Sequence, residues 1–63
     1  MERQEALDYI DRSYSDYFTY GIEGSDLGTP IDRISAMLDI MNMTDDEWNN
    51  GVILECDEDG QEI

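Results

Sequence analysis

The feature that most limits how this chain can fold is its shortage of positive charge. Seventeen Asp and Glu residues stand against three Arg, with no Lys and no His, so the 63-residue chain has a formal net charge of −14. Repulsion among so many uncompensated carboxylates destabilises a compact state, most strongly at low salt. A chain of this length forms one domain at most and buries only about 60% of the surface that its unfolded form exposes. We therefore interpret residues 1–63 as a single small acidic domain with a marginal core.

The same imbalance restricts the partners that the chain can bind. Proteins bind DNA, RNA and anionic membranes through Lys and Arg side chains that neutralise phosphates. We therefore expect no direct contact with nucleic acid or membrane, and a positively charged protein as the partner. The longest apolar runs, such as Val52–Leu54, are three residues long. This predicts neither a transmembrane helix nor a signal-peptide core and favours a cytoplasmic location, in the host cytoplasm if the protein is viral.

High net charge is also typical of disordered chains and of proteins from salt-adapted organisms. Apolar residues make up 40% of this chain, and six of its residues are aromatic. These features, together with a helical spacing of apolar residues, argue against disorder. Four Met, three Asn and seven Ile fit a salt adaptation poorly, but that alternative stays open.

The first predicted element is an amphipathic helix over residues 3–20. Leu7, Ile10, Tyr14 and Tyr17 recur at spacings of 3, 4 and 3, which is typical of the buried face of a helix. Three Gly between residues 21 and 28 then predict a loop. Four side chains would lie on this helix away from the centre of its apolar face, two of them Tyr rings and two of them carboxylates. They are Glu5, Tyr9, Asp16 and Tyr20.

A second amphipathic helix is predicted over residues 30–42. Thr29 is expected to cap it, with Pro30 at the first helical position. The apolar side chains at Ile31, Ile34, Leu38 and Met41 repeat the 3, 4, 3 spacing and would face the core. Three further apolar residues widen this face beyond what one neighbouring helix covers, and we expect them to form a homodimer interface: Ala36, Met37 and Ile40.

A short third helix is predicted over residues 45–50. Thr44 and Glu47 match a capping box, in which each side chain bonds to the backbone N–H of the other residue. Met43 and Trp48 match the hydrophobic staple that often accompanies such a box, and Gly51 is expected to end the helix.

The C-terminal segment is predicted to be a strand or a short β-hairpin. Asp59–Gly60 is a pair typical of two-residue hairpin turns, and folding about it would place Cys56 opposite Ile63. Facing carboxylates weaken such a pairing, so a single strand with an acidic tail remains the alternative. The predicted fold class is therefore mostly α (small α+β), with two amphipathic helices and a short third helix before this strand or hairpin.

Catalytic and metal-binding groups are scarce. Without His or Lys, and with Cys56 among acids that disfavour its thiolate, we expect neither an enzyme nor a cofactor. Glu55, Asp57, Asp59 and Gly60 match the first, third, fifth and sixth positions of an EF-hand loop, but the chain has no Glu at the twelfth. No metal site is therefore predicted, although a weak divalent-ion site is left open.

Carboxylates beside Tyr rings suit a partner rich in Arg and Lys. The predicted partner-binding residues are the four on the first helix and two acidic runs, namely Glu5, Tyr9, Asp16, Tyr20, Asp45, Asp46, Asp57, Glu58 and Asp59. Acids three or four residues apart on a helix lie roughly 4.5–6 Å apart along its axis, on a scale similar to the phosphates of a DNA strand. A surface of this kind can imitate a nucleic-acid backbone.

In size, acidity and lack of catalytic groups the chain resembles the small inhibitors that bacterial viruses and mobile elements direct against nucleic-acid enzymes, including anti-CRISPR and anti-restriction DNA mimics. That resemblance implies an inhibitor that occludes the basic groove of a DNA- or RNA-binding protein or nuclease. It assigns no residue, because such inhibitors share no common fold. The alternative hypothesis is a dimeric acidic adaptor or antitoxin-like module that binds through the second helix and uses charge only to steer association.

Overall fold

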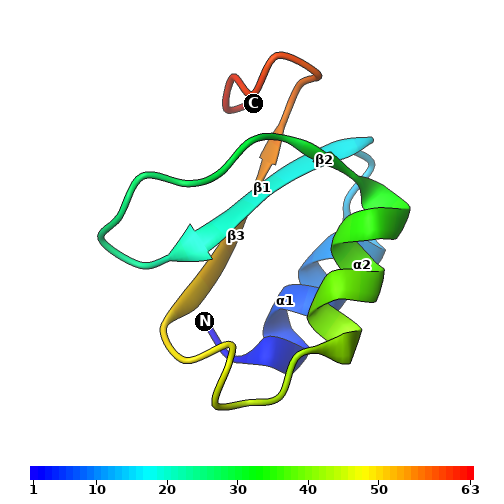
Figure 1. Ribbon diagram of the computed structural model, residues 1–63. Coiled ribbons are helices and arrows are strands. Elements are labelled where there is room, and N and C mark those ends of the chain that lie inside the picture. Colours follow the sequence, from blue (N-terminus) through cyan, green and yellow to red (C-terminus); the bar gives the residue numbers. More distant parts are fainter.

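The computed structural model describes residues 1–63 and contains two helices and three strands (Figure 1). The elements are α1 (Arg3–Arg12), β1 (Tyr17–Ile22), β2 (Ile31–Asp32), α2 (Arg33–Asn42) and β3 (Gly51–Cys56). The strands form one antiparallel sheet in the order β2-β1-β3. The fold is therefore α+β, and the expected mostly α fold with three helices is wrong. Neither helix has the length and apolar character needed to cross a bilayer.

The predicted helix over residues 3–20 is in fact a helix followed by a strand. α1 ends at Arg12, and the Ser13 hydroxyl accepts a hydrogen bond from the Ser15 N–H at 3.1 Å, a local bond that competes with helix. The aromatic and β-branched run Tyr17–Tyr20 favours a strand, and β1 pairs with β3 along six residues. The 3, 4, 3 spacing therefore combined apolar residues of two elements, and it wrongly placed Tyr14, which is 100% exposed, in the core.

α2 begins three residues later than predicted. Ile31 and Asp32 pair with β1 as the short strand β2, so Thr29 and Pro30 precede the helix instead of starting it. The cap is Asp32, whose carboxylate accepts a hydrogen bond from the Ser35 N–H at 3.1 Å. Hydrogen bonds from Ser35, through its side chain and its backbone N–H, hold the pKa of Asp32 below its ordinary value.

The predicted third helix is a compact turn. The capping box itself is confirmed, because the Thr44 N–H donates to Glu47 at 2.9 Å and the Glu47 N–H donates to the Thr44 hydroxyl at 3.2 Å. Asn50, with φ of 59°, adopts the left-handed conformation expected of Gly51. Gly51 is needed for a different reason: a Cβ there would lie 2.5 Å from the ring of Trp48.

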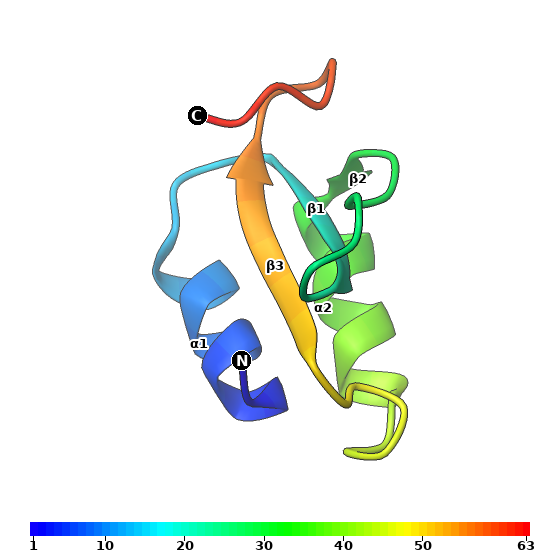
Figure 2. The same cartoon turned by 90° about the vertical axis from the view of Figure 1, so that its left-hand side faces the viewer.

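Both helices pack side by side on the same face of the sheet, behind β1 and β3 in Figure 2. Their inner faces are small and apolar where they meet, since Ala6 and Ala36 are fully buried. The side chain of Trp48 closes the end of the core near the N-terminus, and its Nε1–H donates to the Met1 carbonyl at 2.8 Å. Seven buried residues form this core: Ala6, Ile10, Phe18, Ala36, Ile40, Trp48 and Ile53.

Two of the three Arg side chains connect the helices at opposite ends. Arg3, the first residue of α1, donates to the Met43 carbonyl at the end of α2 at 2.7 Å. Arg33, the first residue of α2, donates to the carbonyls of Ser13 and, at 3.0 Å, Asp11 at the end of α1. The last carbonyls of a helix lack backbone partners and carry its negative dipole end, so these cations stabilise both helix ends. Two of the chain's few positive charges are thus used inside the fold.

The C-terminal segment turns back on β3, but not in the predicted register. The Asp57 N–H donates to the Gln61 carbonyl at 2.9 Å, and Cys56 forms an isolated bridge with Glu62 instead of with Ile63. Gly60, with φ of 87°, ends a three-residue loop over residues 58–60, whereas the prediction assumed a two-residue turn. The extra residue moves Ile63 away from the position opposite Cys56, and its side chain is 75% exposed.

Candidate functional site

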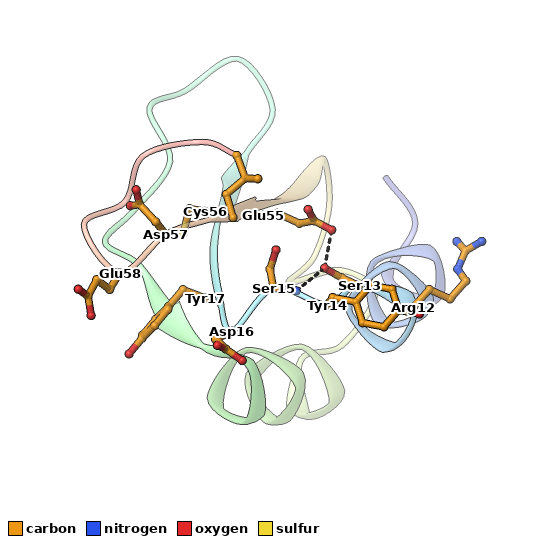
Figure 3. A pocket seen from close by; sticks show the side chains of 11 residues that line it. Arg12, Ser13, Tyr14, Ser15, Asp16, Tyr17, Glu55, Cys56, Asp57 and Glu58 are labelled. Atoms are coloured by element: carbon orange, nitrogen blue, oxygen red, sulfur yellow. Dashed lines mark hydrogen bonds between the residues drawn. The ribbon is translucent and has the colours of Figure 1, made fainter.

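A shallow groove of about 740 Å³ lies where the connection between α1 and β1 meets the end of β3 (Figure 3). One wall is the non-helical segment that follows Arg12. The other wall is the end of β3 together with the C-terminal tail. We call this surface the acidic groove. Its lining residues are Arg12, Ser13, Tyr14, Ser15, Asp16, Tyr17, Glu55, Cys56, Asp57, Glu58 and Ile63.

The charge of the acidic groove is strongly unbalanced. Four carboxylates line it, from Asp16, Glu55, Asp57 and Glu58, against the single guanidinium of Arg12. Arg12 itself donates through Nε to the Asp8 carbonyl of its own helix at 3.2 Å. In Figure 3 its side chain extends away from Asp57 and Glu58. The groove therefore presents a negative field to a ligand, and Arg12 lies at its rim.

Hydrogen bonds fix the two walls of the groove relative to one another. The buried hydroxyl of Ser13 donates to the Glu55 carboxylate across the groove (Figure 3). At the far end, the Asp57 carboxylate accepts the N–H groups of Asp59 at 2.9 Å and Gln61 at 2.8 Å, which holds the tail in its turn. These contacts preorganise the carboxylates of the groove.

Two Tyr rings also line the acidic groove. Tyr14 is 100% exposed and Tyr17 is half-buried beside Asp16. A ring face beside carboxylates can bind Arg or Lys through both cation–π attraction and charge. Sequence reasoning assigned both rings to the core, because it extended the helical period through Ser13–Asp16. The strand-forming run that begins at Tyr17 could have indicated that the helix ends before these two rings.

The thiol of Cys56 in this groove is not activated as a nucleophile. Cys56 is 2% exposed, and burial, followed by the negative charge of Asp57, raises the pKa of its thiol. The thiol therefore stays protonated at neutral pH, and a protonated, buried thiol is a poor nucleophile. No group of three or more carboxylates, Cys or His converges as a cation site. The arrangement suits binding, and its ligand would carry positive charge.

The four side chains predicted to share one helix come from three different segments. Tyr9 on α1 packs edge-on against Phe18, and its hydroxyl accepts the Glu55 N–H at 3.3 Å. Tyr20 on β1 donates to the Asp39 carboxylate of α2 at 3.0 Å. Both rings therefore support the fold, and Glu5 stays exposed on α1. Only Asp16 joins the acidic groove, together with the predicted Asp57 and Glu58.

The remaining predicted acids lie elsewhere on the surface. Asp45 forms an ion pair with Arg3 at 2.9 Å, at the end of α2. Asp46 is exposed beside it, and Asp59 lies in the C-terminal turn outside the groove lining. The structure therefore does not gather the predicted acids into one patch.

α2 exposes apolar residues, but not those expected. Ala36 and Ile40, predicted at a dimer interface, are 0% exposed in the core, and Met37 is half-buried against it. Ile34, Leu38 and Met41, predicted in the core, are 69%, 53% and 56% exposed. The apolar circumference of α2 is as wide as the sequence indicated, but the helix is rotated so that its other side meets the sheet. We call the exposed set the α2 stripe.

Most of the negative charge has no partner within the fold. Seven of the seventeen carboxylates accept a hydrogen bond or pair with Arg3. The other ten make no such contact, and all ten are exposed. They are Glu2, Glu5, Asp11, Asp16, Glu23, Asp26, Asp46, Glu58, Asp59 and Glu62.

No family model matches this chain, and no curated protein or solved structure matches it either.

Proposed function

We propose that this protein is a small acidic inhibitor that mimics the charge of a nucleic acid and occludes the basic groove of a DNA- or RNA-binding protein or nuclease. The observation that supports this proposal best is the set of ten exposed carboxylates without a partner in the fold. Unneutralised charge reduces stability, so a function that uses it accounts for its retention. The proposed partner is a basic nucleic-acid-binding protein in the cytoplasm, and the protein itself needs no catalysis or cofactor.

The acidic groove is the proposed centre of the contact. Its four carboxylates line the same groove as the rings of Tyr14 and Tyr17, so Arg or Lys side chains of the partner would meet both charge and aromatic faces there. Glu5, Asp8 and Asp11 extend the acidic surface along α1 at axial steps of about 4.5 Å, close to the spacing of one charge per about 3.4 Å along a DNA strand. The partner's phosphate-binding side chains would occupy these positions in place of the nucleic acid.

A displacement assay tests the proposal. Proteins from a cell lysate are bound to DNA-cellulose, and the purified protein is added at 0.1 M and at 0.5 M salt. We expect a discrete DNA-binding protein to be released at the lower salt and little at the higher, because contacts of this kind weaken with salt. Asp16→Arg should reduce the release roughly ten-fold, which corresponds to about 1.4 kcal/mol of binding.

The matched control is Asp26→Arg, which makes the same charge change at another exposed carboxylate without a partner, outside the groove. It should reduce release only slightly. Equal effects of the two variants would mean that the groove has no special role. Absence of any release by the wild-type protein at 0.1 M salt would contradict nucleic-acid mimicry.

A second candidate function is an acidic adaptor or antitoxin-like module, dimeric or bound to another protein, that makes its main contact through α2. The exposure of Ile34, Leu38 and Met41 favours it, since apolar side chains on an outer helix face commonly mark a protein interface. Apolar contacts persist at high salt, so an adaptor should keep its partner at 0.5 M salt, whereas a charge mimic should release it.

A further inference from the structure

The α2 stripe is an apolar surface that the fold leaves uncovered. Ile34, Leu38 and Met41 follow one another at spacings of 4 and 3, so they lie in a row along the helix. Their exposed fractions are 69%, 53% and 56%, on the side of α2 away from the buried Ala36 and Ile40. A row at this spacing can pack against the apolar face of another helix.

Carboxylates lie near both ends of this row. Asp39 lies on α2 itself, on the side toward β1, where its carboxylate accepts a hydrogen bond from the Tyr20 hydroxyl. Arg33 bonds to the Asp11 carbonyl, which places Asp11 beside the start of the helix. Arg3 bonds to the Met43 carbonyl and pairs with Asp45, which places Asp45 beside its end. Arg3 therefore partly neutralises Asp45, whereas Arg33 donates to backbone carbonyls and leaves the Asp11 carboxylate without a partner. A ligand on the stripe would therefore meet an apolar row bordered by acids.

A second copy of this chain fits the stripe poorly. A stable dimer interface buries about 800 Å² on each partner, and α2 has ten residues, a length of about 15 Å. Each copy also carries a formal charge of −14, so pairing two stripes would bring two strongly negative molecules together. The borders of the stripe suit a ligand of opposite charge.

We propose that the α2 stripe binds a basic amphipathic helix of a partner protein, whose apolar side chains seat on Ile34, Leu38 and Met41 while flanking Lys or Arg side chains meet the acids near both ends of the row. A longer partner helix can extend over the half-buried side chains of Leu7 and Met37, which pack against the core beneath this surface. Met side chains adapt their shape to apolar ligands. This inference shares with the second candidate function the assumption that α2 is a contact surface. It does not depend on nucleic-acid mimicry.

The test uses a fluorescein-labelled peptide of 18 residues composed of Leu and Lys, with Leu at helical spacing along one face. A scrambled peptide of the same composition, which lacks that face, is the reference. Anisotropy titrations are run at 0.5 M NaCl, where general attraction to the acidic surface is screened. We expect the wild-type protein to bind the patterned peptide at least ten-fold more tightly than the scrambled one.

Leu38→Ser/Met41→Ser should bring this ratio close to one. Ile22→Ser/Ile63→Ser is the matched control, because it removes two apolar side chains that are 60% and 75% exposed outside the stripe, and it should keep the ratio. Amide shifts of the ¹⁵N-labelled wild-type protein should move at residues 34–41 and not at residues 13–17, a measurement that needs no variant.

Several outcomes would overturn the inference. These are a wild-type ratio near one, an equal loss in the control pair, or shifts centred on the acidic groove. A dimer in sedimentation at 0.5 M NaCl that Leu38→Ser/Met41→Ser dissociates would assign the stripe to a second copy. Asp16→Arg separates the two proposals, because it should reduce displacement from DNA and leave the peptide ratio unchanged.

Discussion

The acidic groove and the α2 stripe are built on different supports. The groove lies between an irregular connection and a strand end, and hydrogen bonds hold it: Ser13 to Glu55, Arg33 to Ser13, and Asp57 to the backbone of the tail. The stripe lies on a regular helix whose inner side, Ala36 and Ile40, packs in the core. The groove should therefore respond to single polar substitutions, and the stripe to loss of apolar packing.

This difference also separates the two kinds of partner. The proposed binding in the groove depends on charge, so it should weaken as salt rises. Binding on the stripe depends on apolar area, which salt does not screen. One small protein can thus carry two surfaces whose contributions are distinguished by changing the salt concentration alone.

The largest expected effect tests the support of the stripe. Ile40→Ala removes a fully buried side chain and should lower the free energy of unfolding by about 3 kcal/mol, since such truncations leave cavities. A chain of this size has only about 3–9 kcal/mol to lose. Ile34→Ala, on the exposed side of the same helix, should change it by under about 0.5 kcal/mol.

Urea unfolding followed by circular dichroism measures both variants. Equal losses at the two positions would mean that α2 is not rotated as described. A larger loss at Ile34 would restore the assignment suggested by the sequence, in which Ile34 lies in the core and Ile40 at an interface.

The next effect tests the support of the groove. Arg33→Gln removes donors to the carbonyls of Ser13 and Asp11, and hydrogen bonds from charged groups contribute roughly 1.5–3 kcal/mol. We expect a loss of about 2 kcal/mol and a displaced Ser13–Asp16 segment, visible as amide shift changes there. Arg12→Gln makes the same charge change at an exposed residue and should cost under about 0.5 kcal/mol. A similar loss in both variants would mean that only net charge matters.

Structural features were predictable from the sequence where a few neighbouring residues determine them. The capping box of Thr44 and Glu47 formed as expected, and both amphipathic helices exist near their predicted starts or ends. A C-terminal strand or hairpin was also predicted, from the Asp59–Gly60 turn pair, and β3 is that strand.

Sequence reasoning failed where tertiary pairing decides. Tyr17–Tyr20 has the composition of a strand but also continues the helical spacing of the residues before it, and pairing of β1 with β3 and β2 decides for the strand. The rotation of α2 likewise depends on which apolar side meets the sheet, because both sides are apolar. The acidic groove could not be found for the same reason: it joins Tyr14 and Asp16 to residues about forty positions later, such as Asp57. Composition predicted that a ligand would be positively charged, whereas the position of the groove depends on the fold.

The smallest expected effect is a loss of stability at alkaline pH. One titrating group lies next to each surface, Cys56 at the acidic groove and Tyr20 beside α2. Burial, and then the hydrogen bond to Asp39 and its charge, raise the pKa of Tyr20 above its ordinary 10.0. Burial, and then the charge of Asp57, raise the pKa of Cys56 above its ordinary 9.0. In both cases the folded protein favours the protonated group. The stability that each contributes is therefore fully present below the ordinary pKa and is lost as pH rises through the folded pKa.

We therefore expect the free energy of unfolding to fall above pH 9 through Cys56 beside the groove, and further above pH 10 through Tyr20 beneath α2. Urea unfolding at pH 7, 9, 10 and 11, followed by circular dichroism, measures this decline. Cys56→Ala should reduce the part that begins at the lower pH, and Tyr20→Phe the part that begins at the higher. Tyr14→Phe, at a ring that is 100% exposed, is the control and should follow the wild type. A decline unchanged in Tyr20→Phe would show that the Tyr20–Asp39 contact does not connect α2 to the sheet in solution, and the support of the stripe would then be packing alone.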